Sequence, residues 1–266
     1  MLKIEGLTKS YTDIANPVLS DFNLEVKRGE FVTLIGPSGC GKTTALRIIT
    51  GLLKPDKGIV SVDGKPSAGP ARDKAMVFQH FNLFPWRSAL KNAAYGLEMQ
   101  GVPEKSRLAT ATEYLKLVGL GNHVDYYPWQ LSGGMRQRVG LARALAIHPK
   151  VLLMDEPFGA LDALTREQLQ GMLQRICIEQ NLTVLFVTHS TDEAIYLSDR
   201  VVVMGVKPGR VIAEFTVDLP RPRSSYDWRA NPEYARIRGQ IWKLLQLACC
   251  SDGPEIRDVV TPPICG

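Results

Sequence analysis

The 266-residue chain has no apolar run that approaches the length of a membrane-spanning helix. One of its longest runs, LTVLFVT, has the length of a single strand. Its first residues, MLKIEGLTKSY, lack the apolar core of a secretory signal peptide. These absences predict a soluble, cytosolic chain, so any role at a membrane would require a partner that spans it.

Cysteine is scarce and scattered, and five residues, an odd number, do not form a disulfide framework. The net charge is only +5, from 32 basic and 27 acidic residues. This balance favours a solvated surface of mixed sign over a nucleic-acid-binding face. Internal repeats, low-complexity tracts and heptad runs are also missing, which excludes a long coiled coil.

Short apolar runs without alternation are typical of strands covered on both faces in a parallel sheet. The run EFVTLI leads into a Gly-rich turn and then a helical pattern. The other runs cover residues 74–79, 151–157, 182–189 and 200–205. Between the later runs lie helical patterns, one with an apolar face and one with Ser190 and Glu193 at capping-box spacing. The apolar face consists of Leu169, Met172, Leu173 and Ile176. The order of elements predicts an α/β fold.

Two regions depart from the α/β pattern. Residues 86 to about 148 contain helical stretches and no convincing strand, which predicts a helical subdomain inserted into the core. A Pro- and Arg-rich segment near residue 220 indicates a boundary, so we expect one domain over 1–230 and a C-terminal helix and tail over 231–266. The predicted helix begins with Asn231 as N-cap and Pro232 as first residue. Its apolar face carries Tyr234, Ile237, Ile241 and Leu244, and a loose tail from residue 249 follows.

The stretch GPSGCGKTT, residues 36–44, fits the phosphate-loop pattern G-x-x-x-x-G-K-[ST] between a predicted strand and a predicted helix. Its glycines allow successive backbone amides to point at phosphate oxygens. Lys42 adds a positive charge for the β- and γ-phosphates, and Thr43 supplies a hydroxyl for Mg²⁺. The whole loop is a candidate binding site for the phosphates of ATP. It comprises Gly36, Pro37, Ser38, Gly39, Cys40, Gly41, Lys42, Thr43 and Thr44.

Two carboxylates end the apolar run VLLMDE. The carboxyl end of a strand faces the ligand crevice of an α/β sheet, so Asp155 suits a Mg²⁺ site. Glu156 would then polarise a water for attack on the γ-phosphate. A second candidate anion site is LSGGMRQR, residues 131–138, where two glycines open a predicted helix.

With these motifs in this order, residues 1 to about 230 resemble the ATP-binding-cassette ATPases. The resemblance rests on Tyr11, Gly36–Thr43, Gln79, Leu131–Arg138, Val151–Glu156, Ala160–Asp162 and His189. It implies a P-loop NTPase (RecA-like) core with an antiparallel β subdomain and an inserted helical subdomain. Two positions depart from the family pattern, Met135 where Gln is commoner and Ser190 where Asp is usual.

The resemblance also implies residue roles. Tyr11 would stack on adenine, Gln79 would touch Mg²⁺ or the attacking water, and His189 would hydrogen-bond the γ-phosphate. Two copies would pair head to tail, so that Ser132, Gly133 and Gly134 close on the ATP held by the other copy. Asp162 would belong to the same nucleotide site.

The environment of Cys40, beside Lys42 and near a helix start, predicts a lowered thiol pKa and alkylation by maleimides. A small filler residue is the alternative.

Three functions compete. The segments after Gln79 and after residue 200 resemble importer ATPases for nitrate, taurine and aliphatic sulfonates. That resemblance implies permease subunits, a solute-binding protein, no nucleic acid, and a peripheral place on the cytoplasmic face of the inner membrane. Phe84, Pro85 and Trp86 would grip a partner helix or form a satellite core. The alternatives are a soluble cassette acting on nucleic acid or ribosomes, and a non-cassette P-loop kinase or switch protein.

Overall fold

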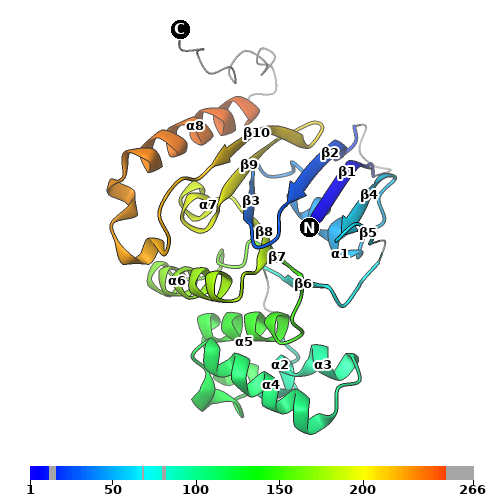
Figure 1. The fold of residues 1–266 in the computed structure, drawn as a ribbon, viewed down its shortest axis with the longest axis vertical. Helices are drawn as coiled ribbons and strands as arrows, with labels where there is room; N and C mark the ends of the chain where they lie inside the picture. The colour runs from blue at the N-terminus through cyan, green and yellow to red at the C-terminus, as the bar shows by residue number, and fades with distance from the viewer. Residues whose placement is uncertain (12–15, 68, 80–81, 250–266) are drawn as a thin grey trace. The chain divides into compact units, whose positions relative to one another are not determined.

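The computed structural model describes residues 1–11, 16–67, 69–79 and 82–249 (Figure 1). The chain divides into two compact units. The first comprises residues 1–26, 30–68 and those from 187 onward, and the second comprises residues 27–29 and 69–186. The predicted tail after residue 249 lies outside the described residues.

The strands of the first unit fall into two sets, an antiparallel sheet and the strands β3 (Phe31–Ile35), β9 (Arg200–Gly205) and β10 (Arg210–Thr216). The antiparallel sheet consists of β1 (Leu2–Lys9), β2 (Leu19–Val26), β4 (Lys57–Val62) and β5 (Lys65–Pro66). The order β2-β1-β4-β5 forms a four-stranded sheet whose pairs are all antiparallel. β3 pairs with β9 in parallel, and β9 pairs with β10 in antiparallel. Every residue of β3 is buried, as its unbroken apolar run predicts.

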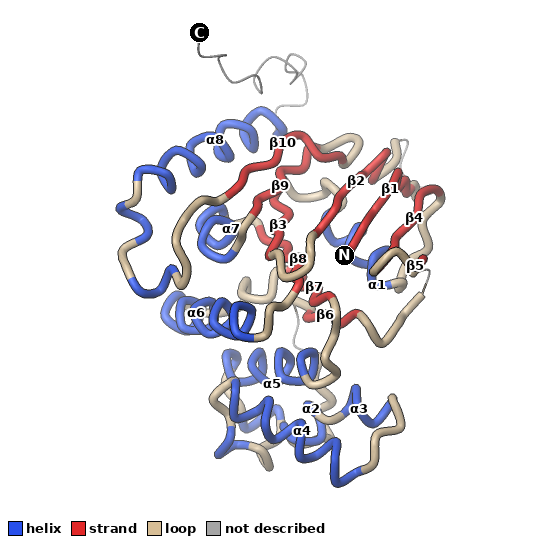
Figure 2. The backbone as a smooth tube through the Cα atoms, viewed as in Figure 1, coloured by secondary structure: helices blue, strands red, loops and turns tan. Residues whose placement is uncertain are grey.

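Three helices complete the first unit, α1 (Lys42–Thr50), α7 (Thr191–Leu197) and α8 (Pro232–Cys249). α7 packs on β3 and β9, and α8 packs on α7 and β9 (Figure 2). The start of α8 is as predicted, because Asn231 Oδ1 accepts a hydrogen bond from the amide of Glu233 at 2.9 Å. Its predicted apolar face is buried.

The second unit holds β6 (Lys74–Val77) and β7 (Val151–Asp155), which pair in parallel, and most of β8 (Thr183–Thr188). Its helices are α2 (Ala89–Ala93), α3 (Tyr95–Met99), α4 (Glu104–Leu117), α5 (Gly133–Leu145) and α6 (Ala163–Glu179). Short 3₁₀ turns cover Gly121–His123 and Pro128–Gln130 here, and Arg223–Ser225 and Trp228–Ala230 in the first unit. From residue 86 to 148, all of it described, the chain forms helices and no strand. The four predicted core residues of α6 are buried.

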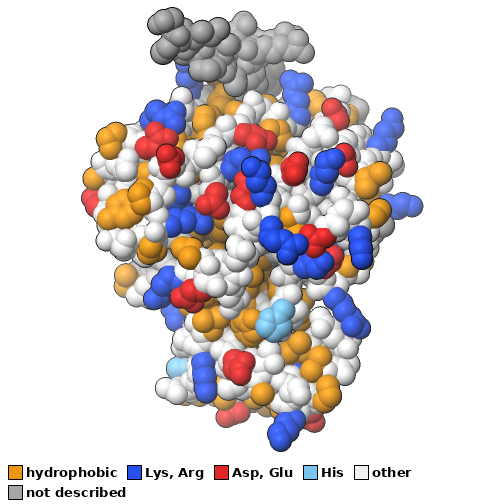
Figure 3. All heavy atoms as spheres, viewed as in Figure 1, with side chains coloured by type: hydrophobic (Ala, Val, Ile, Leu, Met, Phe, Trp, Pro, Cys, Tyr) orange, Lys and Arg blue, Asp and Glu red, His pale blue; other side chains and the backbone are white. Residues whose placement is uncertain are grey.

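Charges of both signs are interspersed over the face drawn in Figure 3, as the composition predicts. Surface charges of the described residues form ion pairs, such as Lys3 with Glu5 at 2.7 Å and Arg87 with Glu98 at 2.6 Å. Within the part of the chain that the structure describes, no helix combines the length and apolar character needed to cross a membrane.

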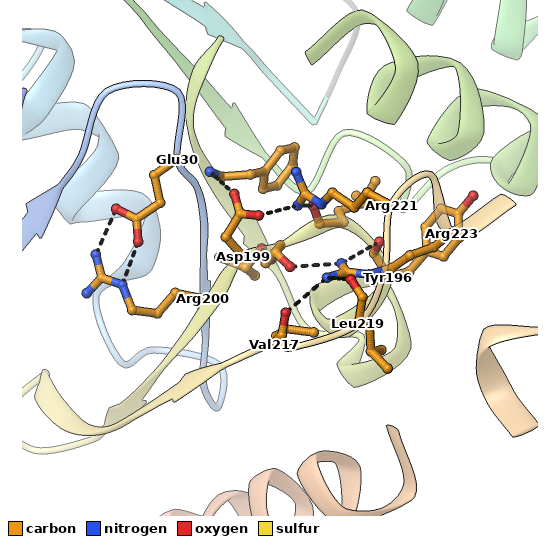
Figure 4. Close-up of polar contacts among 12 residues, drawn as sticks. Glu30, Tyr196, Asp199, Arg200, Val217, Leu219, Arg221 and Arg223 are labelled. Carbon is orange, nitrogen blue, oxygen red and sulfur yellow. Dashed lines mark hydrogen bonds and ion pairs between the residues drawn. The ribbon is translucent and has the colours of Figure 1, made fainter. Parts of the chain in front are cut away.

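Arg223 is buried and joins the segment after β10 to the end of α7 (Figure 4). Its guanidinium donates to backbone carbonyls from both segments. The acceptors are Ile195, Tyr196 and Ser198 at 2.7–2.9 Å, and Val217 and Leu219 at 3.3 Å. Burial, and secondarily the charge of Arg221, lowers the pKa of Arg223 to about 10. Hydrogen bonds to these carbonyls offset part of the cost of burying the guanidinium.

Replacing Arg223 with methionine keeps much of the apolar volume and removes the donors to five carbonyls. We expect a loss of about 3 kcal/mol or more in the free energy of unfolding, measured by denaturant titration. The matched control is Arg236→Met, because Arg236 pairs with Glu233 on the exposed face of α8 and its loss should cost about 0.5 kcal/mol. Equal costs for the two variants would contradict the structural role of Arg223.

Candidate active site

The loop over residues 36–44 connects β3 to α1 in the first unit. Gly39 and Gly41 have φ angles of +81° and +93°, in the left-handed region that glycine adopts without strain. Gly41 is the N-cap of α1 and has no side chain to occupy the helix start. The first-turn amides of α1 have no intrahelical acceptors, so they face the loop together with the positive end of the helix dipole. Such a loop binds phosphate.

Lys42 is the first residue of α1 and is largely buried. Its Nζ donates to the carbonyl oxygens of Gly36 at 2.7 Å and Pro37 at 3.0 Å. The ammonium is thus held inside the loop, where a phosphate oxygen would meet it. Thr43, next in the helix, is half-buried, which is compatible with a hydroxyl that serves a Mg²⁺ ion. Ser38 and Gly39 form the exposed rim of the loop.

Close approach of neighbouring atoms, backbone at Gly36 and Gly209 and side chain at Gly41, accounts for three glycines around this loop. A Cβ on Gly36 would lie 2.7 Å from the carbonyl oxygen of Met204, and one on Gly41 would lie 2.6 Å from Leu19 Cδ2. Gly209, in the turn between β9 and β10, is the tightest, because its Cβ would lie 2.1 Å from the carbonyl oxygen of Cys40. The amide of Gly209 also donates to Val18 at 3.0 Å. Sequence reasoning gave Gly209 no role, and only its place beside proline in KPGR marked it as a turn.

The lowered pKa expected for the Cys40 thiol is wrong, and the structure favours the alternative of a small filler residue. The side chain is fully buried, and this burial raises the pKa of the thiol above its ordinary value. The charge of Lys42 acts in the opposite direction, as expected, but is the smaller effect. Cys40 is therefore a small buried residue of the loop, with its Sγ 3.6 Å from Lys42 Nζ.

Two further predicted site residues belong to the first unit. Tyr11 is exposed, and Lys9 Nζ lies over its ring, 5.9 Å from the centroid. His189 is exposed and directly follows β8 instead of ending it. Ser190 caps α7 by accepting from the amide of Glu193 at 3.3 Å. The second half of the predicted capping box is mediated by Thr188, whose hydroxyl accepts from Ser190 N at 3.0 Å and donates to the Glu193 carboxylate at 2.5 Å.

The other predicted site residues belong to the second unit. Asp155 is the last residue of β7 and is buried, whereas Glu156 follows the strand and is half-buried. The φ angle of Glu156 is +43°, which is uncommon for a residue with a side chain. This backbone conformation turns the chain directly after the strand, so the two adjacent carboxylates do not follow the alternating pattern of a strand.

Gln79 lies close to the turn that follows Glu156. It is exposed and lies two residues beyond β6, so the predicted strand over 74–79 is shorter than expected. A Cβ built on Gly159 would lie 3.9 Å from Gln79 Nε2. Arg166, which sequence reasoning missed, holds the same turn by donating to Phe158 at 3.3 Å and Leu161 at 2.7 Å.

The stretch LSGG begins α5. Ser132 is its exposed N-cap and accepts from the amide of Met135 at 3.3 Å. A Cβ on Gly134 would lie 2.4 Å from Thr165 Cγ2, so the start of α5 packs closely on the start of α6. Asp162 caps α6 by accepting from Thr165 N at 3.0 Å, and this hydrogen bond lowers the pKa of the Asp162 carboxyl. Gly133 is half-buried.

Within the second unit the structure thus gathers Gln79, the turn from Glu156 to Asp162, and the start of α5. The first unit holds the loop of residues 36–44 with its supports, and in the same unit His189 directly precedes the cap of α7. The residues of the second unit offer carboxylates, an amide and a helix start, and the first unit offers a phosphate-binding loop. Together these features define a P-loop nucleotide-binding protein.

Comparison with known proteins narrows this class. The sequence profile described as ABC transporter matches residues 19–159. The ABC transporter ATP-binding protein MJ0412 of Methanocaldococcus jannaschii is 51% identical over 92% of this chain and 91% of its own length. The nitrate import ATP-binding protein NrtD of Synechocystis sp. is 45% identical over 86% of this chain and 88% of NrtD. The bicarbonate transport ATP-binding protein CmpC of Synechocystis sp. is 49% identical over 90% of this chain, a match that spans 36% of CmpC.

A solved structure agrees with this assignment. The ABC transporter cassette MJ0796, solved as a dimer, matches with a TM-score of 0.73 and 36% identity over 83% of this chain and 100% of that chain. The chain belongs to the ABC transporter family. It is an ATP-binding ATPase with the α/β P-loop fold that the motifs predict.

Substituting Gly209 with alanine tests the support of the loop. The added Cβ would meet the Cys40 carbonyl oxygen and force the loop to shift, which we expect to weaken ATP binding by about tenfold. Calorimetric titration with ATP measures the change. Gly69→Ala is the control, since a Cβ there meets nothing within 4 Å. An unchanged affinity in Gly209→Ala would show that the contact is not needed.

Burial predicts that Cys40 resists alkylation in the folded protein. At neutral pH we expect its peptide to carry no maleimide label after treatment of the native chain, as followed by mass spectrometry. The same peptide should be labelled after unfolding in guanidinium, which serves as the control. Labelling of native Cys40 as fast as of a free peptide thiol would contradict the structure.

Proposed function

We propose that this chain is the ATP-hydrolysing subunit of an importer for a small oxyanion and acts through separate permease subunits. The observation that carries the proposal is its similarity to two proteins named for transport of such anions, bicarbonate in CmpC and nitrate in NrtD. The transported anion would contact the permease and a solute-binding protein, and this chain would lie peripherally on the cytoplasmic face of the membrane. The nucleic-acid and ribosome alternative gains no support from the comparisons.

ATP would bind with its phosphates on the loop of residues 36–44 and its adenine on Tyr11. The amides at the start of α1 and the ammonium of Lys42 suit the β- and γ-phosphates. Oxygen donors of Thr43, Gln79 and Asp155 would hold Mg²⁺, which prefers hard oxygen ligands. When bound, this ion would neutralise charge on the phosphates.

A second copy of the chain would complete the site. Its exposed Ser132, the amides near Gly133 and Gly134, and Asp162 would close on the γ-phosphate from the side opposite to the loop. The chain would then work as a head-to-tail dimer joined by two ATP molecules. The related cassette MJ0796 was solved as a dimer, which supports a pair of chains here.

Hydrolysis would start from Glu156, which accepts a proton from the attacking water. His189 would hydrogen-bond the γ-phosphate and help to hold that water, while Gln79 would orient it. The proton would pass from water oxygen to the Glu156 carboxylate as the bond to the γ-phosphorus forms and the bond to the ADP oxygen breaks. Loss of the γ-phosphate would remove the group that both copies share.

The permease contact would include Trp86. Its side chain is 71% exposed, whereas the adjacent Phe84 is half-buried and packs 4.5 Å from the ring of Tyr95, between centroids. An exposed aromatic side chain on a rigid base suits a groove that receives a partner helix. Of the two interpretations that the sequence allowed, Phe84 fits the satellite core and Trp86 fits the docking surface.

Replacing Glu156 with glutamine should lower ATP turnover by about 100-fold or more, because the amide cannot accept the proton. ATP binding should persist, so the variant should accumulate as an ATP-dependent dimer in size-exclusion chromatography with light scattering. Cells that depend on this chain for uptake of labelled nitrate or bicarbonate should lose that uptake with the variant.

Glu179→Gln, on the exposed end of α6, provides the matched control and should behave as wild type. Unchanged turnover in Glu156→Gln would refute the assigned base. Normal uptake of both anions in cells that lack the chain would refute the importer role for these solutes.

A further inference from the structure

His189 lies between two residues whose positions are fixed by α7. Thr188, at the end of β8, and Ser190, the cap of α7, are joined by the hydrogen bond from the Ser190 amide to the Thr188 hydroxyl. That hydroxyl also donates to the buried Glu193 carboxylate inside α7. The position of the His189 backbone therefore depends on the position of α7. This helix is short and begins after a single intervening residue, Ser190.

The first turn of α7 is tied to α8 through Asp192. Tyr234 donates its hydroxyl proton to Asp192 Oδ1 at 2.9 Å, and Arg238 Nε donates to the same oxygen at 3.2 Å. Arg238 is more than half exposed, so its pair contributes little. Tyr234 is buried, and although the Asp192 carboxylate is 44% exposed, a hydrogen bond from a hydroxyl to a carboxylate is stronger than one between neutral groups. The Tyr234 contact is therefore the one that orients this turn.

Aromatic packing fixes the Tyr234 ring itself. The ring meets Trp228 edge-on, with centroids 4.9 Å apart and planes at 85°. Trp228 in turn packs on Tyr196 of α7 at 5.2 Å. Both partners are largely buried, so the hydroxyl of Tyr234 is presented to Asp192 from a rigid base.

The opposite end of α7 is held by the segment before α8. Arg223 donates to carbonyls of Ile195, Tyr196 and Ser198, and Arg221 donates to the carbonyl of Leu197 (Figure 4). Arg221 also pairs with Asp199 at 3.2 Å. Residues 217–249, here called the C-terminal extension, therefore contact both ends of the helix that follows His189.

We propose that the C-terminal extension positions His189 for ATP hydrolysis, with Tyr234 as the positioning residue that acts through Asp192 and α7. This inference rests on the proposed role of His189. The phosphate loop has its own supports in Gly209 and in the Lys42 hydrogen bonds. Loosening α7 should accordingly reduce turnover and leave ATP affinity intact.

The test is Tyr234→Phe in the full chain, which keeps the ring against Trp228 and removes only the hydroxyl. The expected result is a three- to tenfold fall in kcat for ATP with KM changed less than twofold. Arg236→Gln is the matched control on the same helix, because Arg236 pairs with Glu233 and Gln240 instead of α7. Asp192→Asn weakens the same hydrogen bond by changing its acceptor and should lower kcat in the same way. This second variant keeps the test valid if Tyr234→Phe does not fold.

A second background separates positioning from general destabilisation. In a His189→Ala chain, where slow turnover is followed by release of labelled phosphate over hours, Tyr234→Phe should cause no further loss. If Tyr234→Phe lowers turnover equally in both backgrounds, or does not lower it in the wild-type background, this inference is overturned while the proposed function stands. Wild-type turnover of His189→Ala itself would refute the role of His189 and the inference with it.

Discussion

The close approach of backbone segments around the phosphate loop is the constraint on which this site depends. Gly36, Gly41 and Gly209 bring β9, the turn after it and the start of β2 against the loop at distances that leave no space for a Cβ. Since a loop that binds phosphate through backbone amides must keep its amides converged, contacts that fix the backbone matter as much as the side chains of the motif. Lys42 adds to this rigidity by bonding two loop carbonyls.

The two units use different means to hold their functional residues. In the second unit, helix starts do so. Ser132 and Asp162 cap α5 and α6, and Gly134 lets the two starts pack together. In the first unit, the segment from His189 through α7 is held by side chains that come from far along the chain, Arg223 and Tyr234 above all. A buried arginine that donates to carbonyls of two segments fixes the backbone of both at once.

Prediction from the sequence succeeded where one local pattern decides a structure. Buried strands follow unbroken apolar runs, and Asn231, Ser190 and the apolar face of α8 mark helices through spacing alone. Strand ends were less accurate, because β6 ends at Val77 and β8 at Thr188, before the polar residues that follow them. The pKa direction expected for Cys40 was wrong because charge is visible in a sequence, whereas desolvation depends on neighbours that the fold supplies.

The sequence by itself determined the class of this protein, since the phosphate-loop motif, the LSGG stretch and the acidic strand end each require a particular residue type at a particular spacing. Only the tertiary structure decided how those motifs are supported. Gly209 lies against the carbonyl of Cys40, 169 positions earlier in the chain, and Tyr234 bonds Asp192, 42 positions earlier, in the helix after His189. Contacts of that kind depend on which segments the packed core brings side by side, and no local spacing encodes them.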